Sequence, residues 1–342
     1  MALKKMFPYH IRGRFCNRPG ETGSGLSTFV RMCFRALWHG RSGASCMRPW
    51  CARRGGLGTS CPKPSIVWIG HATFLIQLAG FTVITDPVFG SISRMFARIL
   101  EPGIALQNLP KIDAILISHN HRDHMDEKSL LALKAANPLV AVYVPLGNGE
   151  WFTRRGFAQV HECTWWESHT VGVASDVQVH CLPAIHWSRR GMFDRNKALW
   201  SSWLIKSPES TIYFAGDTAY GPHFKTIGES FKPIDMALMP IGPCEPHELM
   251  RHSHVSPEEA VRACADLQAS VMIPMHWGTF KLGCDEPLDP LHRLRNVWRN
   301  SPELVAGKRC LVRPCGSVIS LPIPPDISVE TDLIASYSQA DH

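Results

Sequence analysis

Acidic side chains are nearly absent from the first 62 residues of this 342-residue chain. Glu21 is the one acid there, against eleven Lys and Arg residues, which gives the segment a formal charge of +10. Because the whole chain carries +7, residues 63–342 sum to −3. A net negative body lacks the basic footprint that binding to a polyanion requires, so nucleic acid is not an expected partner.

The chain also lacks the cysteine spacing of a zinc ribbon. Its twelve cysteines include no C-x-x-C pair and are scattered, so they indicate neither a structural zinc site nor a disulfide framework. The N-terminus has no uninterrupted apolar stretch before a small-residue cleavage site, and no secretory signal is expected. These absences predict an intracellular protein, cytoplasmic or peripherally bound to a membrane.

Within residues 1–62, the stretch LSTFVRMCFRALW places apolar side chains on one helical face and Arg31 and Arg35 on another. This pattern is typical of a membrane-surface helix or an organelle-targeting peptide, and the alternative is a disordered extension or a misplaced start codon. We therefore predict a basic, poorly ordered N-terminal extension over 1–62, with this one amphipathic helix, and a single folded domain over 63–342.

One stretch of the folded domain imitates a membrane span. No Asp, Glu, Lys or Arg occurs from Pro64 to Thr85. However, Gly70, Gly80, the polar His71 and the abundant β-branched residues favour a strand hairpin. This region is therefore predicted to form strands.

Short β-rich runs then alternate with helical patterns, without an internal repeat or a long linker. Helix punctuation is clear at SPEEAVRACADLQ, where Ser256 can cap, Pro257 suits the first helical position and Glu259 completes a capping box. Such alternation predicts an α/β fold, with helices and two sheets layered as a four-layered αββα sandwich.

The stretch ILISHNHRDHMD concentrates metal-ligand side chains behind a predicted strand. His119 and His121 are two residues apart and can project to the same side, while Asp123 and His124 occupy the following turn. Imidazole and carboxylate are the usual ligands of zinc, and α/β proteins commonly build sites at strand ends. A metal site is predicted here.

Three further β-rich runs end in a ligand residue: His186 in CLPAIHW, Asp217 in FAGDTAY and His276 in IPMHWG. Seven candidate ligands are too many for one tetrahedral zinc with an open position, but they suit two metals that share a carboxylate. Asp123 and Asp217 would offset the repulsion between the two cations.

In this order, the motifs resemble those of the metallo-β-lactamase-fold hydrolases. Further stretches resemble the N-acyl-phosphatidylethanolamine-hydrolysing phospholipase D family and its bacterial relatives, from about Ser65 to about Gly283 and more weakly to residue 323. They are WIGHATFLI, ITDPVFG, LISHNHRDHMD, YVPLGNGEW, LPAIHW, ALWSSW, FAGDTAYGPHF, PIGPCEPHELM, HVSPEEAV and HWGTF.

The resemblance implies a role for each motif residue. One zinc would be held by His119, His121 and His186, and the other by Asp123, His124 and His276. Asp217 would bridge the two ions, and His71 and Asp86 would orient the ligands. The candidate catalytic residues are Asp123 and His254, the latter facing the substrate phosphate just before the capped helix.

The resemblance implies two Zn²⁺ per chain, with Mn²⁺ or Fe²⁺ as alternatives. A hydroxide held between the metals would attack the phosphorus of N-acyl-phosphatidylethanolamine and release an N-acylethanolamine, leaving phosphatidate. The expected partners are a phospholipid or other phosphodiester substrate, a membrane surface for the basic segment, and a second copy in a homodimer. Ser253 departs from the glutamine usual in the family, which leaves the substrate open.

Three other functions remain open from the sequence. A lactonase or other small-molecule ester hydrolase would use the same two-metal centre. A nuclease would need a local patch from Arg154, Arg155, Arg189 and Arg190. A metal-stabilised binding module is the non-catalytic alternative. The tryptophans near the motifs fit either an acyl channel or a buried core: Trp151, Trp165, Trp166, Trp187, Trp200, Trp203 and Trp277.

Overall fold

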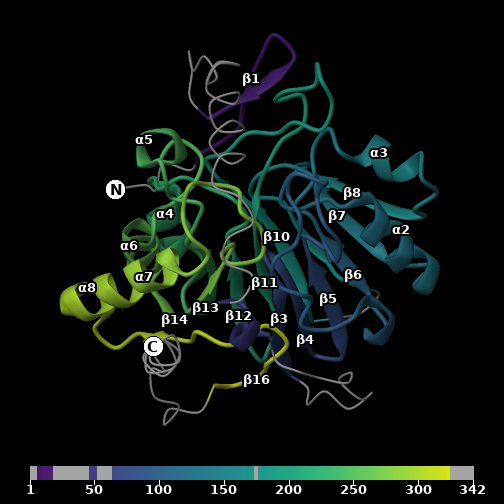
Figure 1. Ribbon diagram of the computed structural model, residues 1–342. Helices are drawn as coiled ribbons and strands as arrows, with labels where there is room; N and C mark the ends of the chain where they lie inside the picture. Colours follow the sequence, from purple (N-terminus) through teal and green to yellow (C-terminus); the bar gives the residue numbers. More distant parts are fainter. Residues whose placement is uncertain (1–5, 18–45, 52–63, 173–175, 324–342) are drawn as a thin grey trace.

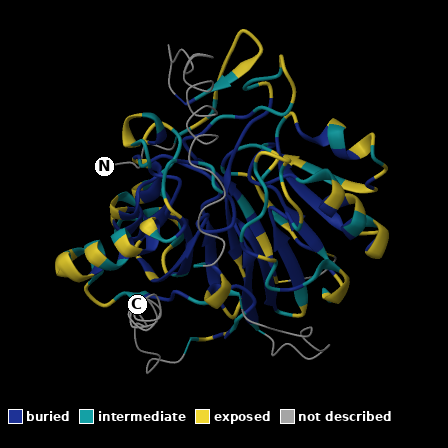
Figure 2. Ribbon diagram, in the orientation of Figure 1, coloured by how far each residue is buried: buried dark blue, intermediate teal, exposed yellow. Residues whose placement is uncertain are grey.

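Two seven-stranded sheets face each other in the computed structural model, which describes residues 6–17, 46–51, 64–172 and 176–323. Helices cover both outer faces, so the layers are αββα as predicted (Figure 1). Figure 2 shows the strands buried between the layers and the exposed residues on the helices and loops. A separate two-stranded hairpin comprises β1 (Tyr9–Ile11) and β2 (Arg14–Cys16).

The first sheet carries the predicted hairpin strands and the strand that precedes the ligand motif. In spatial order its strands are β16 (Val318–Ser320), β3 (Ser65–Gly70), β4 (Thr73–Leu78), β5 (Phe81–Thr85), β6 (Ala114–Leu116), β7 (Ala141–Pro145) and β8 (Gln159–Cys163). The apolar stretch that imitates a membrane span is thus three antiparallel strands. Among the described residues, no helix is both long and apolar enough to cross a membrane.

The second sheet is also mixed, with three parallel pairings at one end. Its strands are β15 (Arg309–Cys310), β14 (Ala269–Met275), β13 (Ile234–Pro240), β12 (Thr211–Phe214), β11 (Ser202–Lys206), β10 (Gln178–Leu182) and β9 (Ser168–Thr170). Strands covered on both faces read as continuous apolar runs rather than alternating ones. β12 and most of β13 are buried along their length, and their sequences accordingly lack strict alternation.

The helices divide between the two outer faces. Beside the first sheet lie α2 (Glu127–Ala136) and α3 (Gly149–Thr153), and beside the second lie α4 (His223–Phe231), α5 (His247–Met250), α6 (Pro257–Asp266), α7 (Asp289–Asn300) and α8 (Pro302–Val305) (Figure 1). Two 3₁₀ turns are η1 (Arg48–Trp50) and η2 (Leu106–Asn108). The predicted capping box is present at α6, where Ser256 and Glu259 bond each other's backbone N–H.

Contacts between the sheets fix the end of β6, where the ligand motif begins. The buried Trp203 of β11 donates its indole N–H to Ile117 O at 2.9 Å. Next to it, Ser201 N–H donates to Ser118 O at 2.8 Å. The first ligand segment is therefore anchored to the opposite sheet before it reaches His119.

The described parts of the N-terminal segment pack against the folded domain. Met47 and Trp50 are each 1% exposed, and Trp50 meets Trp277 edge to face at a centroid distance of 5.2 Å. The backbones of Cys51 and Cys315 form an isolated parallel β-bridge, and neither thiol is in a disulfide. The division at residue 62 stays a prediction, and the predicted helix in LSTFVRMCFRALW lies outside the described residues.

Trp50 provides a test of this packing. Replacing it with alanine removes a fully buried indole, so we expect Trp50→Ala to lower the free energy of unfolding by about 3–5 kcal/mol. Urea titration would measure the change. In the control Leu139→Ala, the side chain is 74% exposed, and a change within about 0.5 kcal/mol is expected. Equal stabilities of the two variants would contradict a structural role for residues 46–51.

Candidate metal centre

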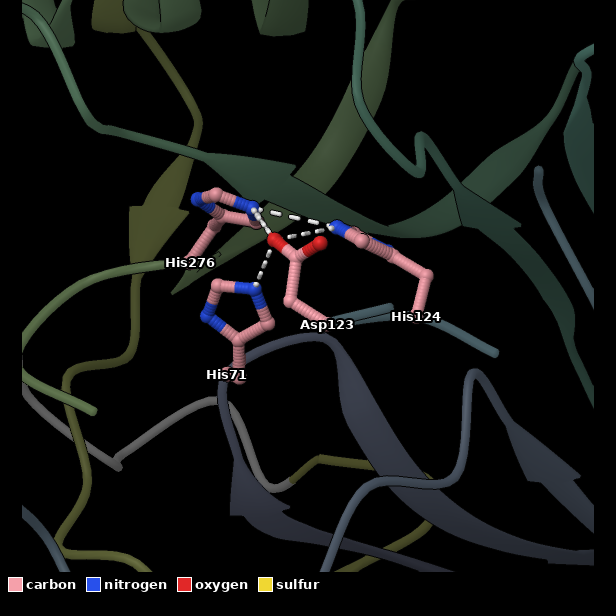
Figure 3. Close-up of side chains that lie close together, drawn as sticks. All are labelled: His71, Asp123, His124 and His276. Carbon is pink, nitrogen blue, oxygen red and sulfur yellow. Dashed lines mark hydrogen bonds and ion pairs between the residues drawn. The ribbon is translucent and has the colours of Figure 1, made fainter. Parts of the chain in front are cut away.

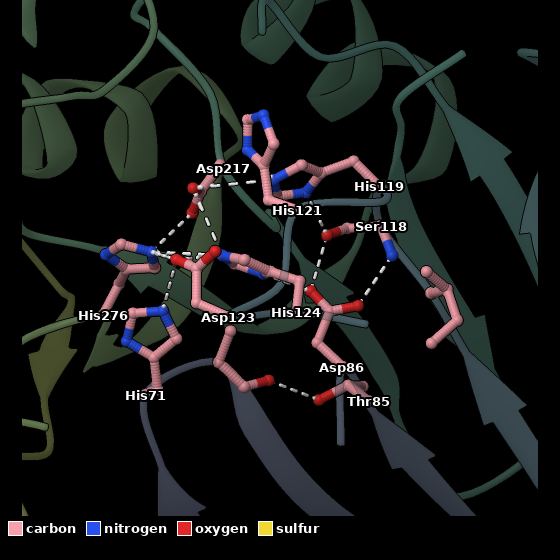
Figure 4. Close-up of polar contacts among 12 residues, drawn as sticks. His71, Thr85, Asp86, Ser118, His119, His121, Asp123, His124, Asp217 and His276 are labelled. Atoms are coloured by element: carbon pink, nitrogen blue, oxygen red, sulfur yellow. Dashed lines mark hydrogen bonds and ion pairs between the residues drawn. The ribbon is translucent and has the colours of Figure 1, made fainter. Parts of the chain in front are cut away.

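Both sheets contribute ligand side chains to one centre beyond their strand ends (Figure 4). His71 lies in the turn between β3 and β4, Asp86 follows β5, and the segment 118–124 follows β6. The second sheet adds His186 after β10, Asp217 after β12 and His276 after β14. All seven predicted ligands meet there, together with the two residues predicted to orient them.

Three histidines form the first group of potential ligands. His119 Nε2 lies 2.8 Å from His121 Nδ1, and His186 Nε2 lies 3.3 Å from the same nitrogen. Burial lowers the pKa of all three rings, that of His121 to about 4. The rings are therefore neutral at physiological pH and can direct lone pairs at a shared cation.

The second group gathers around Asp123, as Figure 3 shows. Asp123 Oδ2 lies 3.1 Å from His71 Nε2 and 3.5 Å from His124 Nε2. The same oxygen lies 3.8 Å from His276 Nε2, and the two Nε2 atoms of His124 and His276 are 3.2 Å apart. His71 thus lies within this group, in contact with Asp123 as an orienting residue would, and burial lowers its pKa to about 3.

Asp217 lies between the two groups. Its Oδ2 is 3.9 Å from His119 Nε2 and 3.7 Å from His186 Nε2 in the first group. In the second group, Oδ2 lies 3.2 Å from His124 Nε2, and Oδ1 lies 3.0 Å from His276 Nε2. One carboxylate therefore reaches both groups, as a bridging ligand must.

Asp86 determines which ring nitrogens carry protons. It accepts from Ser118 N–H at 2.7 Å and from the Ser118 hydroxyl at 2.5 Å. The single hydrogen of that hydroxyl is used in the hydrogen bond to Asp86, so its oxygen accepts from His119 Nδ1 at 2.9 Å. His124 Nδ1 donates directly to Asp86 Oδ2 at 2.7 Å. With one proton of each ring held at Nδ1, Nε2 is the nitrogen that can present a lone pair to a cation, one in each group.

The charge balance of the centre tests whether its residues fit a cation. Asp86, Asp123 and Asp217 lie within it, and the ion pairs recorded for them in the described residues all come from histidines. Burial raises the pKa of Asp217, but His124 and His276 hold it well below its usual range. Burial lowers the pKa of His124, but the carboxylates of Asp217 and Asp123 raise it well above its usual value. The buried carboxylates thus draw positive charge into the centre, and this donor set fits divalent metal ions.

Backbone strain accompanies the site. His71, Asp86 and His276 adopt positive φ values of 54°, 33° and 61°, a region that residues other than glycine rarely occupy. Gly216, before Asp217, has φ +58°, and a Cβ there would lie 2.6 Å from Ser118 Cβ. The glycine of the G-D motif is therefore required for the close approach of the two sheets.

A cavity of about 500 Å³ opens onto the centre. It reaches His121, Asp123 and Asp217, and its walls combine arginines with apolar side chains. The wall residues are Ile92, Phe96, Arg122, Trp187, Arg189, Arg190, Gly191, Met192, Pro243, His254 and Leu282.

His254 lines this cavity, and its side chain is only 14% exposed. Its Nδ1 lies 3.8 Å from Asp217 Oδ2, and burial lowers its pKa to about 4. It precedes the capped helix α6, as predicted from the sequence. Its role in catalysis stays a prediction.

Sequence reasoning missed several residues of the site. Ser118 lies inside the ligand motif but carries no ligand signature, and its hydroxyl matters only because Asp86 faces it. Arg189 and Arg190 were considered only as a nucleic-acid patch, although a basic pair directly after His186 could have indicated an anionic substrate. Most of the tryptophans near the motifs are core: Trp165, Trp200, Trp203 and Trp277 are buried, whereas Trp187 lines the cavity.

Comparison with protein families agrees with this geometry. A family described as "Beta-lactamase superfamily domain" matches residues 82–277. The chain belongs to the metallo-β-lactamase superfamily. Its sheets and ligand-bearing strand ends are those of a metallo-β-lactamase fold, and the chain is a metal-dependent hydrolase of that fold.

Two similar members of the superfamily carry the name N-acyl-phosphatidylethanolamine-hydrolyzing phospholipase D. The protein from Caenorhabditis elegans is 36% identical over 243 residues, which cover 67% of this chain and 68% of that protein. The mitochondrial protein from Saccharomyces cerevisiae is 34% identical over 245 residues, covering 69% of this chain and 52% of its own length. A UPF0173 metal-dependent hydrolase from Caldivirga maquilingensis is 29% identical over 259 residues, 75% of this chain and 97% of that one.

Solved structures share the fold at low identity. The metallo hydrolase Igni18 from Ignicoccus hospitalis has a TM-score of 0.57 and 22% identity, covering 75% of this chain and 97% of its own. An isothiocyanate hydrolase from Delia radicum gut bacteria has a TM-score of 0.59 and 17% identity, covering 75% and 99%. At these identities the likeness shows the metallo-β-lactamase fold alone.

Asp86 provides a test of the metal centre. Asp86→Asn keeps the volume but turns an amide N–H₂ toward groups that donate, so we expect affinity for metal ions to fall about 10–100-fold in both groups. Dialysis against chelator-buffered zinc, followed by metal counting, would measure it. The control is Asp235→Asn. Asp235 lies at the start of β13, and its carboxylate accepts from Thr211 N–H. Unchanged metal content in Asp86→Asn would contradict this role.

Proposed function

We propose that this chain hydrolyses a phosphodiester, N-acyl-phosphatidylethanolamine, and releases an N-acylethanolamine and phosphatidate. The observation that carries the proposal is the cavity, where two ligand groups sharing Asp217 meet arginines and an apolar wall. The resemblance to the two phospholipase D relatives supports the same substrate. The arginines suit the phosphate of such a lipid, and the apolar wall suits its acyl chains.

Two zinc ions are the proposed cofactors. His119, His121 and His186 would hold one ion, Asp123, His124 and His276 the other, and Asp217 both, while His71 would orient Asp123. When bound, the ions supply the Lewis acidity that lowers the pKa of water and offsets charge on the phosphoryl oxygens. Asp123 also lines the cavity and would accept the proton that the attacking water loses.

The arginines of the cavity would bind the substrate phosphate. Arg190 donates to Met125 O at 2.7 Å, and its guanidinium lies 4.6 Å from the centre of the Trp151 ring. Burial lowers its pKa to about 10, so it stays charged at neutral pH. A positive group held in place in this way is suited to a phosphate oxygen, and Arg122 and Arg189 lie in the same wall.

The leaving group is an alkoxide, which needs a proton as the phosphorus–oxygen bond breaks. His254 is the proposed donor, because its ring lines the cavity beside Asp217. Since burial lowers its pKa to about 4, the ring is neutral at neutral pH, and it would first take up the proton that the attacking water loses by way of Asp123. The apolar side chains of the cavity wall would contact the acyl chains. Met192 lines the cavity and is 76% exposed, and Ile92, Phe96 and Leu282 also line it.

A carboxylic-ester or lactone hydrolase is the second candidate. The ligand set does not by itself distinguish attack at phosphorus from attack at carbon, and the relative named UPF0173 metal-dependent hydrolase aligns over 97% of its length. Binding of the basic segment to a membrane, a homodimer and the cellular compartment stay predictions.

Assay of the purified protein tests the proposed function. We expect about two zinc ions per chain and release of N-acylethanolamine from N-acyl-phosphatidylethanolamine. His121→Ala and Asp217→Asn should each abolish turnover, because each substitution alters a proposed ligand of the metal ions that the reaction needs. Removal of the metal by a chelator should do the same, and added zinc should restore activity.

The matched control is His292→Ala, an exposed histidine on α7. It should keep both metal content and turnover. Two zinc ions without lipid turnover would reject the proposed substrate and favour lactones or other carboxylic esters.

A pair of substrates tests the proton donor. His254→Ala should lower kcat for the lipid about 10²–10⁴-fold, because its alkoxide is a poor leaving group. An activated aryl phosphodiester needs no such proton, so its turnover should change little. Equal effects on the two substrates would contradict the role of His254 as an acid.

A further inference from the structure

An N-terminal segment outside the family match holds the backbone of a predicted metal ligand. Asn17 follows β2, at the end of the described residues 6–17, and is 7% exposed. Its side-chain Nδ2 donates to His186 O at 2.9 Å, and its Oδ1 accepts from His186 N–H at 3.2 Å. The two residues are 169 positions apart in the chain.

A side-chain amide that bonds both backbone groups of one residue fixes that residue in position and direction. The His186 ring has a third fixed point, because its Nδ1 donates to Ser253 O at 2.8 Å. With the backbone and the ring both held, Nε2 can point only toward the first group of ligands. Asn17 therefore determines where one of the three histidine lone pairs lies.

The same N-terminal segment also holds the far end of the loop that begins at His186. Phe15 N–H donates to Asn196 O at 2.7 Å, and the Arg14 guanidinium bonds Arg195 O. The loop closes on itself, since Asn196 bonds the backbone of Ser188 through both its own N–H and its side chain. We call residues 6–17 the strap and residues 186–196 the ligand loop.

The ligand loop carries more of the site than His186. Trp187 packs on the His121 ring at a centroid distance of 4.1 Å, and Arg195 lies over Trp187 at 4.7 Å. Arg189 and Arg190, further along the loop, line the cavity. A strap that moves the loop would therefore move two histidines of the first group and one wall of the cavity.

We propose that the strap holds the ligand loop in place over the metal centre, and that Asn17 is a positioning residue for His186. The inference rests on the proposed role of His186 as a metal ligand. It adds to the centre a residue from a segment that lies before the region matched by the family, residues 82–277. Metal binding in this chain then depends on a part of the sequence that carries no ligand.

Zinc titration of the 342-residue chain tests the inference. Asn17→Ala removes both hydrogen bonds to the His186 backbone. Asn17→Asp keeps the size and the acceptor but cannot donate to His186 O. In both variants we expect one of the two zinc-binding steps to weaken about 10-fold, measured by competition with a chromophoric chelator. Asn300→Ala, the same substitution at an exposed helix end, should leave both steps unchanged.

Thermal unfolding with and without zinc separates positioning from general stability. A clamp acting on the metal site should reduce the rise in Tm that zinc produces, because that rise follows metal affinity. A merely structural role would lower the metal-free and metal-loaded Tm equally and leave affinity unchanged, which would overturn the inference. So would wild-type affinity in Asn17→Asp beside weakened affinity in Asn17→Ala, since packing alone would then explain the effect.

The titration uses zinc alone, so its outcome does not depend on the substrate. Absence of lipid turnover would reject the proposed reaction and leave the strap intact. Lipid turnover together with unchanged zinc affinity in both Asn17 variants would reject the strap and leave the reaction intact.

Discussion

Asp86 lies at the end of β5 with its carboxylate wholly buried, and hydrogen bonds from Ser118 and His124 converge on it. Through the Ser118 hydroxyl it also acts on His119. One carboxylate thereby sets the proton positions of a histidine in each ligand group. Burying an ionised group is costly unless it is well paired, and here the pairing prepares the two groups for cations. The remaining geometry of the centre depends on this arrangement.

The centre exists only where the two sheets meet. The first sheet supplies His119, His121, Asp123 and His124, and the second supplies His186, Asp217 and His276. Each ligand group contains residues from both sheets. Packing contacts between the sheets therefore hold the metal ligands together, and a bound metal would in turn hold the sheets together.

The cavity above the centre combines two kinds of chemistry. Its wall contains arginines, and Arg190 is anchored by backbone carbonyls, by an indole ring and by the Glu127 carboxylate 3.9 Å away. The wall also contains apolar side chains. The combination suits a substrate with an anionic phosphate and long acyl chains, which is the class of molecule in the names of the two phospholipase D relatives.

Much of the fold and of the ligand set could be predicted from the sequence, because both depend on local pattern. The run of uncharged residues with glycines predicted a strand hairpin where the structure has β3, β4 and β5, and the spacing after AILIS predicted a ligand cluster at a strand end. The capping box at Ser256 is local in the same way.

By contrast, contacts between distant segments have no local signature. The clamp of Asn17 on His186, the relay from Asp86 through Ser118 to His119, and the packing of Trp50 on Trp277 each join residues that only the tertiary structure brings together. Which side chains can bind metal follows from the sequence alone, because ligand chemistry belongs to the residue. Which nitrogens carry protons, and which segments hold the ligands in place, follow only from the fold, because they depend on neighbours that lie far apart along the chain.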